Sequence, residues 1–594
     1  MDEHVCACLA PLRTRSDWLL AECTNDGGLV RRVTGRELVD RVRALAHAFR
    51  RSRAPLCAVY AAGCVDWVVA ALAALSAGIA VAPLNARISG PELRRAVAVL
   101  TREGKDPLGL LVADDARLAR WRESQEEMPQ LVVRINGDGG VPGSAAAWGT
   151  GDVGFFPSTA ALARHFYDGG APNVSENRHA SDGAAFIIFT SGTTGGAPKA
   201  AVLSHAALNA QSRAKIEYAG YTDSDVYLNT APLHHVGGLS SMLAYLMAGG
   251  RQLFMVARPQ RNATRHGGGD KFDALAVLRC CREHHVTSII AVPTMIFDMD
   301  RASRDPIALN LTKVLIGGGG LSRKLMRSIR RIFPVAKVMT AYGMTEAASS
   351  ITFADSNDWE QQQLLVPGMD GNYVGRPAKH FDIRIAQTSP SHPSNGDAVG
   401  AHGRAGEIEI RGVSVMSRYL NEDRESLSTS RRQGQWFATG DIGVVLDDGR
   451  VFLMGRKKDV IRVGSENVHA SEVEAIVLEM RGVNAAAVVG LPDDRLGEVV
   501  AVMVTLEEGW IWLGRGGHEE RSASSGGPVD RRAVVSESKL QAHCREAGLA
   551  GFKVPKFVVP SPGNSLPLTA LGKVVKNEVK GALLSSLRMQ RPRL

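Results

Sequence analysis

The chain has 594 residues, 45% of them apolar, and its 70 Lys and Arg outnumber its 61 Asp and Glu for a formal net charge of +9. A chain of this length is too long for one core and predicts about three or four folding units, and its composition is typical of a globular protein. Because the Arg-rich spots carry no interleaved aromatic side chains, we expect anionic small-molecule substrates and no nucleic-acid partner.

The cysteines and the apolar stretches restrict the class of protein further. The eight cysteines follow no zinc-ligand spacing and form no C-x-x-C pair, so they are expected to be reduced thiols of an intracellular protein. The nearly uncharged stretch 67–82 is shorter than the ~20 residues that cross a bilayer, so we expect a buried helix and strand and no membrane-spanning segment.

Both ends of the sequence bear on targeting. The acidic residues Asp2 and Glu3 disfavour a signal or transit peptide. The last three residues, Pro592, Arg593 and Leu594, resemble the Ser-Lys-Leu peroxisomal address. They predict a peroxisomal location and an import receptor as a partner, with chloroplast and cytoplasm as the alternatives.

Short apolar runs alternate with helical patterns through most of the chain before residue 380. These runs are residues 56–60, 79–83, 109–112, 184–189, 288–292 and 313–316. Such alternation predicts parallel sheets covered by helices, and therefore an α/β fold. Stretches rich in Gly, Ser, Pro or Arg are expected to be loops, and the last of them to be disordered; they are residues 137–154, 258–269, 389–406 and 514–532.

The loop after the apolar run 184–189 reads TSGTTGGAPK. Its glycines let backbone N–H groups approach a phosphate closely, its hydroxyls can donate hydrogen bonds, and its lysine supplies a positive charge. It is not a Walker A loop, because Lys199 lies between Pro198 and Ala200 and no Ser or Thr follows it. We therefore predict a nucleotide-phosphate site of another type. The residues expected in it are Thr190, Ser191, Gly192, Thr193, Thr194, Gly195 and Lys199.

Three later motifs carry side chains suited to the rest of a nucleotide site. TAYGMTEAASS follows an apolar strand and places Glu346 where an open α/β sheet binds ligands, so this carboxylate is a candidate magnesium ligand. WFATGDIG presents Asp441 between glycines, suited to accept hydrogen bonds from ribose hydroxyls, and LPLTALGK places Lys573 on an exposed turn. Residues 447–449 predict a hairpin, and after residue 455 strands and helices alternate in a compact unit of normal domain size.

In this order and at these separations, the motifs closely resemble those of the adenylate-forming superfamily, which holds acyl-CoA synthetases, peptide-synthetase adenylation domains and beetle luciferases. The resemblance covers nearly the whole chain. It implies a large N-terminal region of parallel sheets flanked by helices, with a smaller β-barrel-like part, over residues 1–455. It also implies a small mobile α+β domain over residues 456–594 that carries the catalytic lysine.

The resemblance also implies a reaction and a set of roles. A carboxylate attacks the α-phosphorus of ATP and expels pyrophosphate, Lys573 stabilises the transition state, and the small domain then rotates about Lys458 so that CoA can attack the acyl-adenylate. ATP, Mg²⁺ and CoA are therefore expected. Beyond the phosphate loop, the implied nucleotide-site residues are Gly318, Tyr342, Gly343, Thr345, Asp441, Arg456 and Gly464, and the implied magnesium site holds Thr194 and Glu346.

Two positions depart from the family pattern. The phosphate loop is one residue longer than G-x-P-K-G and ends in Ala200 instead of glycine, which leaves the contact made by Lys199 open. Arg462 stands where a lysine is common. A catalytically silent nucleotide-binding relic is therefore one alternative reading of the sequence.

The acid is suggested by PLHHVGGLSS, in which His235 matches the histidine that borders the acyl carboxylate in the family. The HxGGLSS form resembles 2-succinylbenzoate-CoA ligases of phylloquinone and naphthoquinone biosynthesis, and peripheral strings resemble the plant members. We therefore expect His235, Ser240, Gly318 and Ser349 to surround an aromatic dicarboxylic acid. A 4-coumarate or fatty acyl-CoA ligase remains the alternative within the class, and the motifs do not separate a luciferase-type oxygenase.

Overall fold

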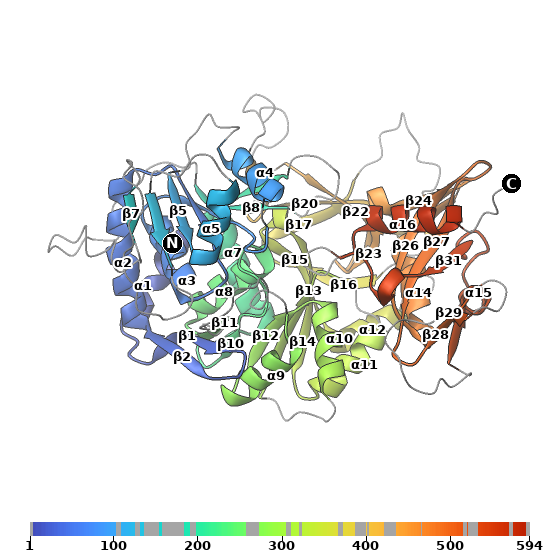
Figure 1. Ribbon diagram of the computed structural model, residues 1–594, viewed down its shortest axis with the longest axis horizontal. Coiled ribbons are helices and arrows are strands. Elements are labelled where there is room, and N and C mark those ends of the chain that lie inside the picture. The colour runs from blue at the N-terminus through green and yellow to red at the C-terminus, as the bar shows by residue number, and fades with distance from the viewer. Residues whose placement is uncertain are drawn as a thin grey trace.

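The computed structural model describes residues 4–88, 90–101, 109–124, 131–135, 154–156, 183–190, 198–256, 272–303, 310–319, 323–365, 372–386, 399–400, 403–420, 435–464, 466–514, 519–520, 533–568 and 574–589. Two large sheets and their helices form the main body of the molecule, and a smaller unit built from the C-terminal part lies beside it (Figure 1). The α/β architecture that the alternation predicts is confirmed.

The first sheet has the strand order β21-β9-β8-β4-β3-β5-β6-β7. Its strands are β3 (Leu56–Tyr60), β4 (Ala80–Pro83), β5 (Leu110–Ala113), β6 (Leu131–Arg134), β7 (Gly154–Phe156), β8 (Ala184–Phe189), β9 (Ala200–Ser204) and β21 (Arg418–Tyr419). The pairs from β8 to β7 are parallel, whereas β9 runs antiparallel to β8 and β21. The helices of this part are α1 (Leu9–Leu12), α2 (Gly35–Ser52), α3 (Val65–Ser76), α4 (Gly90–Leu100) and α5 (Asp115–Ser124), preceded by η1 (Val5–Cys8).

The apolar stretch 67–82 forms a buried helix and strand, as expected. Helix α3 is buried along almost its whole length. The next element along the chain, β4, is a buried strand of the first sheet. A helix that is apolar on every side belongs inside a core. Among the described helices, none combines the length and hydropathy needed to span a bilayer.

The second sheet has the order β17-β20-β22-β23-β16-β15-β14-β13-β12-β10-β11-β1-β2. Its parallel centre consists of β1 (Trp18–Thr24), β10 (Val226–Leu228), β11 (Arg251–Val256), β12 (Ser288–Ala291), β13 (Lys313–Gly317) and β14 (Lys337–Met344). Antiparallel strands extend it on both sides: β2 (Leu29–Thr34), β15 (Ser349–Asp355), β16 (Asn372–Pro377), β17 (Phe381–Ile385), β20 (Gly406–Gly412), β22 (Phe437–Val445) and β23 (Val451–Arg456). Its helices are α9 (Ala274–Glu283), α10 (Pro293–Ala302), α11 (Arg323–Ile332) and α12 (Ser356–Leu365).

The β-barrel-like part is present as this antiparallel extension. The strands from β15 to β17 continue the large sheet and, within the described ranges, form an open array and not a closed barrel. The expected loop 389–406 contains a short hairpin of β18 (Val399–Gly400) and β19 (Gly403–Arg404). Most of the other expected loops lie outside the described residues.

Helices α7 (His205–Ala219) and α8 (Val236–Ala248) lie between the two sheets. One side of the pair packs with β8 and β9 in a core that includes Phe186, Leu208 and Leu239. The other side packs with the second sheet through Ala214 and Tyr245. A polar side chain on either helix therefore lies in an interior and needs a partner there.

The C-terminal unit is an α+β domain, as expected. Its main sheet holds β24 (Val460–Val463), β25 (Glu466–His469), β26 (Val483–Asp493), β27 (Gly497–Leu506) and β31 (Phe557–Pro560), and a smaller one holds β28 (Ile511–Leu513), β29 (Glu519–Glu520) and β30 (Val534–Ser536). The helical elements are η3 (Lys457–Asp459), α14 (Ala470–Glu479), α15 (Glu537–Glu546), η4 (Pro562–Asn564) and α16 (Lys576–Met589). Strand β29 lies within the stretch expected to be disordered, where it pairs with β28.

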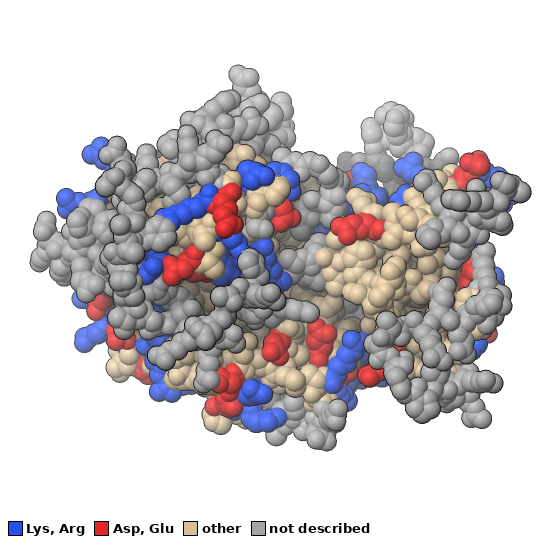
Figure 2. Space-filling model, in the orientation of Figure 1, with Lys and Arg blue, Asp and Glu red and all other residues tan. Residues whose placement is uncertain are grey.

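Polar contacts join this unit to the main body. Lys324 on α11 donates to the Val483 carbonyl oxygen at 2.8 Å and to Glu507 Oε1 at 2.5 Å. Arg301 at the end of α10 donates to Asn484 Oδ1. On the face shown in Figure 2, positive and negative side chains are interspersed, so the excess of positive charge is not gathered into one patch there.

Candidate active site

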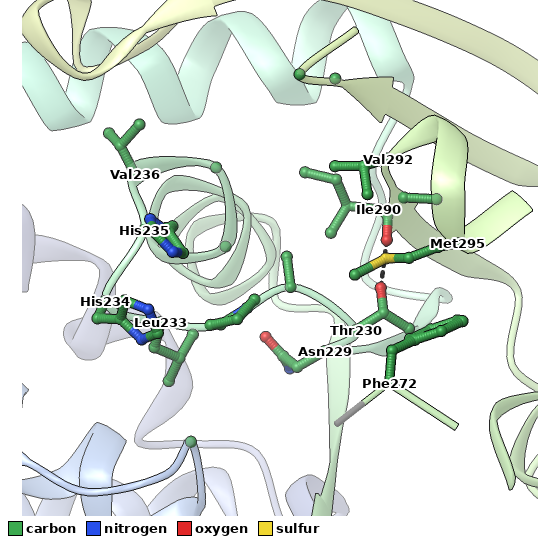
Figure 3. Close-up of a pocket in the computed structure, with 18 of the residues that line it drawn as sticks. Asn229, Thr230, Leu233, His234, His235, Val236, Phe272, Ile290, Val292 and Met295 are labelled. Carbon is green, nitrogen blue, oxygen red and sulfur yellow. Dashed lines mark hydrogen bonds between the residues drawn. The ribbon is translucent and has the colours of Figure 1, made fainter. Parts of the chain in front are cut away.

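A cavity of about 500 Å³ lies at the carboxyl ends of the parallel strands. Its walls come from segments that follow β4, β10, β12 and β13 and from the turn between β14 and β15. Ligands of open α/β sheets bind at this edge because strands end there and loops begin. Figure 3 shows His234 and His235 on one side of the cavity and Ile290, Val292 and Met295 on the other. Of the predicted residues, His235, Gly318, Gly343, Thr345 and Ser349 line it.

His235 is held at the start of α8. Its N–H donates to the Pro232 carbonyl oxygen at 3.1 Å, and its own carbonyl oxygen accepts from Leu239 N–H at 2.9 Å. Gly238 allows this close turn, because a Cβ there would collide with the Ala231 and Pro232 carbonyl oxygens. The neighbouring His234 is buried beside Arg87, and burial lowers the pKa of His234 to about 3, so it is neutral near pH 7.

The end of β14 and the turn that follows it hold four predicted residues, Tyr342, Gly343, Thr345 and Glu346, of which Gly343 and Thr345 line the cavity. It contains the short helix η2 (Thr345–Ala347), and Ala348 and Ser349 then have φ of 53° and 134°. These values are strained for residues with side chains. A Cβ at position 343 would collide with the Ser349 carbonyl oxygen, so glycine is required there.

Gln211 on α7 holds this strained turn in place. Its Nε2 donates to the Ala347 and Ser350 carbonyl oxygens at 3.1 and 2.6 Å, and its Oε1 accepts from Ser350 N–H at 3.2 Å. The side chain is fully buried. Sequence reasoning did not select Gln211, because no local signal shows that α7 is enclosed by two sheets.

Asp441 on β22 contacts two side chains, those of Tyr342 and Arg456. Tyr342 OH donates to its Oδ2 at 2.6 Å, and Arg456 Nε lies 2.7 Å from its Oδ1. The antiparallel register of β22 and β23 places Asp441 opposite Arg456. Burial and the adjacent carboxylate raise the pKa of Tyr342 well above its usual value, so its hydroxyl remains a donor. A ribose reaches Asp441 only by sharing the carboxylate or displacing one of these groups.

A second chain of contacts joins the phosphate loop to the proposed magnesium ligand. Lys199 Nζ lies 4.8 Å from the centre of the Tyr419 ring, and Tyr419 OH donates to Glu346 Oε1 at 2.7 Å. Thr190 N–H donates to the Lys199 carbonyl oxygen at 2.8 Å and closes the base of the loop. The predicted loop residues Ser191, Gly192, Thr193, Thr194 and Gly195 lie outside the described residues.

Ser240 lies behind the cavity wall and not on it. It is fully buried, and its Oγ accepts a hydrogen bond from Lys215 Nζ at 2.6 Å. Lys215, on α7, does line the cavity. Sequence reasoning missed this lysine, because its position in the helical pattern does not reveal that α7 is enclosed by two sheets.

The C-terminal domain contributes to the cavity through Leu568. Leu568 pairs with Val574 in an isolated bridge that frames residues 569–573, and Lys573 itself lies outside the described residues. The last described residue before the predicted catalytic lysine therefore lies at the cavity wall. The other predicted residues of this domain lie away from that wall, with Lys458 in η3 and Gly464 at the end of β24 with φ of 64°.

One cluster of possible ligands lies behind the cavity. Cys23 on β1 and Cys280 on α9 have their Sγ atoms 3.1 Å apart, and His284 lies close enough to share an ion with them. Both thiols are fully buried, and the contact between them together with burial raises the pKa of Cys280. The 257 residues that separate the cysteines hide this pair from any spacing rule.

Comparisons with known proteins cover both parts of the chain. Residues 19–420 match the family described as AMP-binding enzyme, and residues 472–573 match the AMP-binding enzyme C-terminal domain. The chain is 35% identical to the 2-succinylbenzoate–CoA ligase, chloroplastic/peroxisomal, of Arabidopsis thaliana, over 99% of this chain and 98% of that protein.

Two solved structures share the fold. One is ATP-bound MatB from Rhodopseudomonas palustris, with a TM-score of 0.72 and 23% identity over 98% of this chain and 99% of that one. The other is the o-succinylbenzoate CoA synthetase MenE from Bacillus subtilis in complex with the acyl-adenylate OSB-AMP, with a TM-score of 0.67 and 22% identity over 97% and 96%.

Proposed function

The chain belongs to the AMP-binding enzyme family of acyl-CoA ligases, and on that premise we propose that its acid is 2-succinylbenzoate. In the first step ATP and the acid give the acyl-adenylate and pyrophosphate. In the second step CoA displaces AMP and gives 2-succinylbenzoyl-CoA. The product would serve phylloquinone or naphthoquinone biosynthesis.

The cavity carries this proposal. Its volume of about 500 Å³ lies within the ~300–1,000 Å³ range of small-molecule sites. Small residues, among them Gly237, Gly238 and Gly318, leave room for an aromatic ring, and Ser349 offers polar contacts on the same wall. The relative from Arabidopsis, matched over nearly its full length, supports the same acid.

We assign the first half-reaction to residues on both sides of the cavity. His235 and Thr345 border the reacting carboxylate, the loop from Thr190 to Lys199 receives the pyrophosphate, and Asp441 binds the ribose. Lys573 stabilises charge on the phosphate oxygens as the bond forms. Charge that builds on phosphate is the main barrier to such a transfer, so fixed cations and N–H donors supply most of the catalysis.

Glu346 fits the role of a magnesium ligand. Within the described part of the chain only its Oε1 receives a hydrogen bond, from Tyr419, so Oε2 is left for an ion. Carboxylate and hydroxyl oxygens suit Mg²⁺, and Thr194 would add a hydroxyl. When bound, the ion neutralises charge on the pyrophosphate.

The second half-reaction requires a different face of the C-terminal domain. We place the domain boundary between residues 455 and 456 and the hinge at Lys458. Rotation there withdraws Lys573 and brings the segment at Gly464 toward the acyl-adenylate, where the CoA thiol attacks the carbonyl carbon and AMP leaves. The few polar contacts between the domains are compatible with such a movement.

The test is the formation of AMP and acyl-CoA by the purified protein with ATP, Mg²⁺ and CoA. The acids would be 2-succinylbenzoate, 4-coumarate and octanoate. Selective turnover of 2-succinylbenzoate supports the proposal, whereas preference for either other acid assigns the chain to the alternative ligase classes. No pyrophosphate release with any acid would indicate a silent nucleotide-binding protein.

We also propose a peroxisomal location through residues 592–594, which lie outside the described residues. The name of the Arabidopsis relative includes both chloroplast and peroxisome. A fluorescent protein that ends in residues 585–594 should enter peroxisomes of plant cells. The same fusion with Leu594→Asp should stay in the cytosol, and equal distribution of the two fusions would contradict the assignment.

A further inference from the structure

Lys215 is a buried cation that belongs to none of the sequence motifs described above. It lies on α7 between the two sheets, and its relative exposure is 0%. Placing an ammonium group in such an interior costs several kcal/mol unless an anion or a metal site compensates it. The position therefore needs an explanation.

The contacts of Lys215 satisfy its hydrogens but not its charge. Its Nζ donates to Ser240 Oγ at 2.6 Å, to Ser241 Oγ at 2.9 Å and to the Gly237 carbonyl oxygen at 3.3 Å. All three acceptors are neutral. Among the residues that the structure describes, no carboxylate forms an ion pair with it, whereas the half-buried Lys313 is paired with Asp225 at 2.6 Å.

The cavity is where a compensating anion can come from. Lys215 lines the cavity together with Gly237, Gly238, Ser349 and Ser350. The first turn of α8 forms the same wall, and the N-terminus of a 13-residue helix adds a partial positive charge. Two independent features, the Lys215 ammonium group and the N-terminus of α8, thus favour an anion at this wall. The proposed nucleotide residues Tyr342 and Asp441 are not part of it.

We propose that Lys215 binds a second carboxylate of the acid, the one that does not react. This carboxylate takes the place of the Gly237 carbonyl oxygen, the most distant of the three acceptors, while Ser240 and Ser241 position the ammonium group. The inference rests on the proposed function and adds a basis for substrate specificity. The enzyme selects acids with two carboxylates. A dianion neutralises the buried ammonium, whereas an apolar tail would leave it without a counter-charge. The site is a specificity determinant and takes no part in the transfer of the acyl group.

The test compares two acids that differ only in the second carboxylate. These are 2-succinylbenzoate and 4-oxo-4-phenylbutanoate, which lacks the carboxylate on the ring. The wild-type protein should use the first with a kcat/KM about 100-fold higher. Equal kcat/KM for both acids would overturn the inference while leaving the proposed ligase intact, whereas turnover of neither acid would overturn the proposed function.

Variants then assign the discrimination to this lysine. Lys215→Met keeps the length of the side chain and removes its charge, so kcat/KM for 2-succinylbenzoate should fall about 100-fold while that for 4-oxo-4-phenylbutanoate stays the same or rises. Lys379→Met, at an exposed lysine paired with Glu217, is the matched control and should change neither value. The Kd for AMP, which should be unchanged in both, shows that the fold is intact. An equal loss with both acids would indicate a structural role for Lys215 and contradict the inference.

Discussion

The hydroxyl of Tyr342 donates a 2.6 Å hydrogen bond to Oδ2 of Asp441, and this bond joins the last parallel strand of the second sheet to its antiparallel extension. The two residues belong to separate motifs 99 positions apart. The bond joins the end of β14 and the proposed ribose carboxylate into a single unit. Arg456, the last residue of β23, completes it from the other oxygen.

Removing the Tyr342 hydroxyl tests whether this unit binds the nucleotide. Tyr342→Phe leaves Asp441 with one hydrogen-bond donor fewer to orient it, and a hydrogen bond to a charged group is worth ~1.5–3 kcal/mol. We expect the Kd for ATP, measured by calorimetry, to rise about tenfold. Tyr218→Phe is the control, because it keeps the stacking of that ring on Phe353. An unchanged Kd in both variants would separate Asp441 from nucleotide binding.

Gln211 should contribute strongly to stability. Gln211→Leu fits the volume but removes the three hydrogen bonds to the turn and a contact with His380, and it leaves the Ser350 N–H and the Ala347 carbonyl group without this partner in the interior. We expect a loss of about 2 kcal/mol, seen as a lower Tm, and a larger relative loss of ATP–pyrophosphate exchange because the strained turn is released. A Tm equal to that of the wild type would show that the turn holds without Gln211.

Glu346→Gln tests the magnesium assignment. The amide keeps an acceptor for Tyr419 OH but removes the charge that a divalent cation prefers. The Mg²⁺ concentration for half-maximal pyrophosphate release should rise about tenfold, while the Kd for AMP without magnesium should be unchanged. An unaltered magnesium requirement would mean that another group holds the ion.

Lys573→Ala tests whether this lysine acts in adenylate formation and not in the transfer of the acyl group to CoA. Adenylate formation should fall at least about 100-fold, because the charge that stabilises the transition state is lost. Transfer of the acyl group from supplied acyl-adenylate to CoA should remain largely intact, because the lysine is withdrawn before that step. An equal loss in both assays would contradict the assigned role.

The pH dependence of KM tests the state of Lys215. Burial lowers the pKa of this ammonium to about 7 in the free protein, so it is mostly charged below that pH and mostly neutral above it. Binding of the second carboxylate requires the charged form, so KM for 2-succinylbenzoate should rise as pH increases from 7 to 9. KM for 4-oxo-4-phenylbutanoate should not, and Lys215→Met should abolish the difference.

The other ionisable groups near Lys215 should not obscure this profile. Burial raises the pKa values of Tyr221, Tyr227 and Tyr245 above their usual value, so these tyrosines stay neutral over the range. His234 stays neutral because burial lowers its pKa to about 3. His235 lines the cavity in the assays of both acids, so the ratio of the two KM values isolates Lys215.

The parts that local pattern controls could be predicted from the sequence. The runs at β3, β8 and β12 read as buried strands because they are short, apolar and bounded by turn residues, and the glycine and hydroxyl motifs follow strand ends as ligand loops do. The HxGGLSS motif predicts Ser240 at the acid, because its small hydroxyl leaves room for a ring. The helical period instead turns it toward α7, where it contacts Lys215.

Features that depend on how elements far apart in the sequence pack around a residue could not be predicted. Gln211 and Lys215 are ordinary helix residues until α7 is known to lie between two sheets. Whether the barrel-like part closes also could not be predicted. Closure depends on how far the twist of β16 to β17 brings the edges together, which no local motif encodes, and within the described ranges this part is open.

Leu568 gives the cavity a wall that belongs to a second domain. An acid that fills the cavity up to this wall touches both domains at once, so its binding free energy depends on their relative orientation and the orientation in turn depends on the bound acid. Changes at Leu568 should therefore alter the rate of domain rotation and the affinity for the acid together. An inhibitor that reaches across the same boundary would act by arresting the catalytic cycle at the stage before rotation, without contact with any of the nucleotide residues.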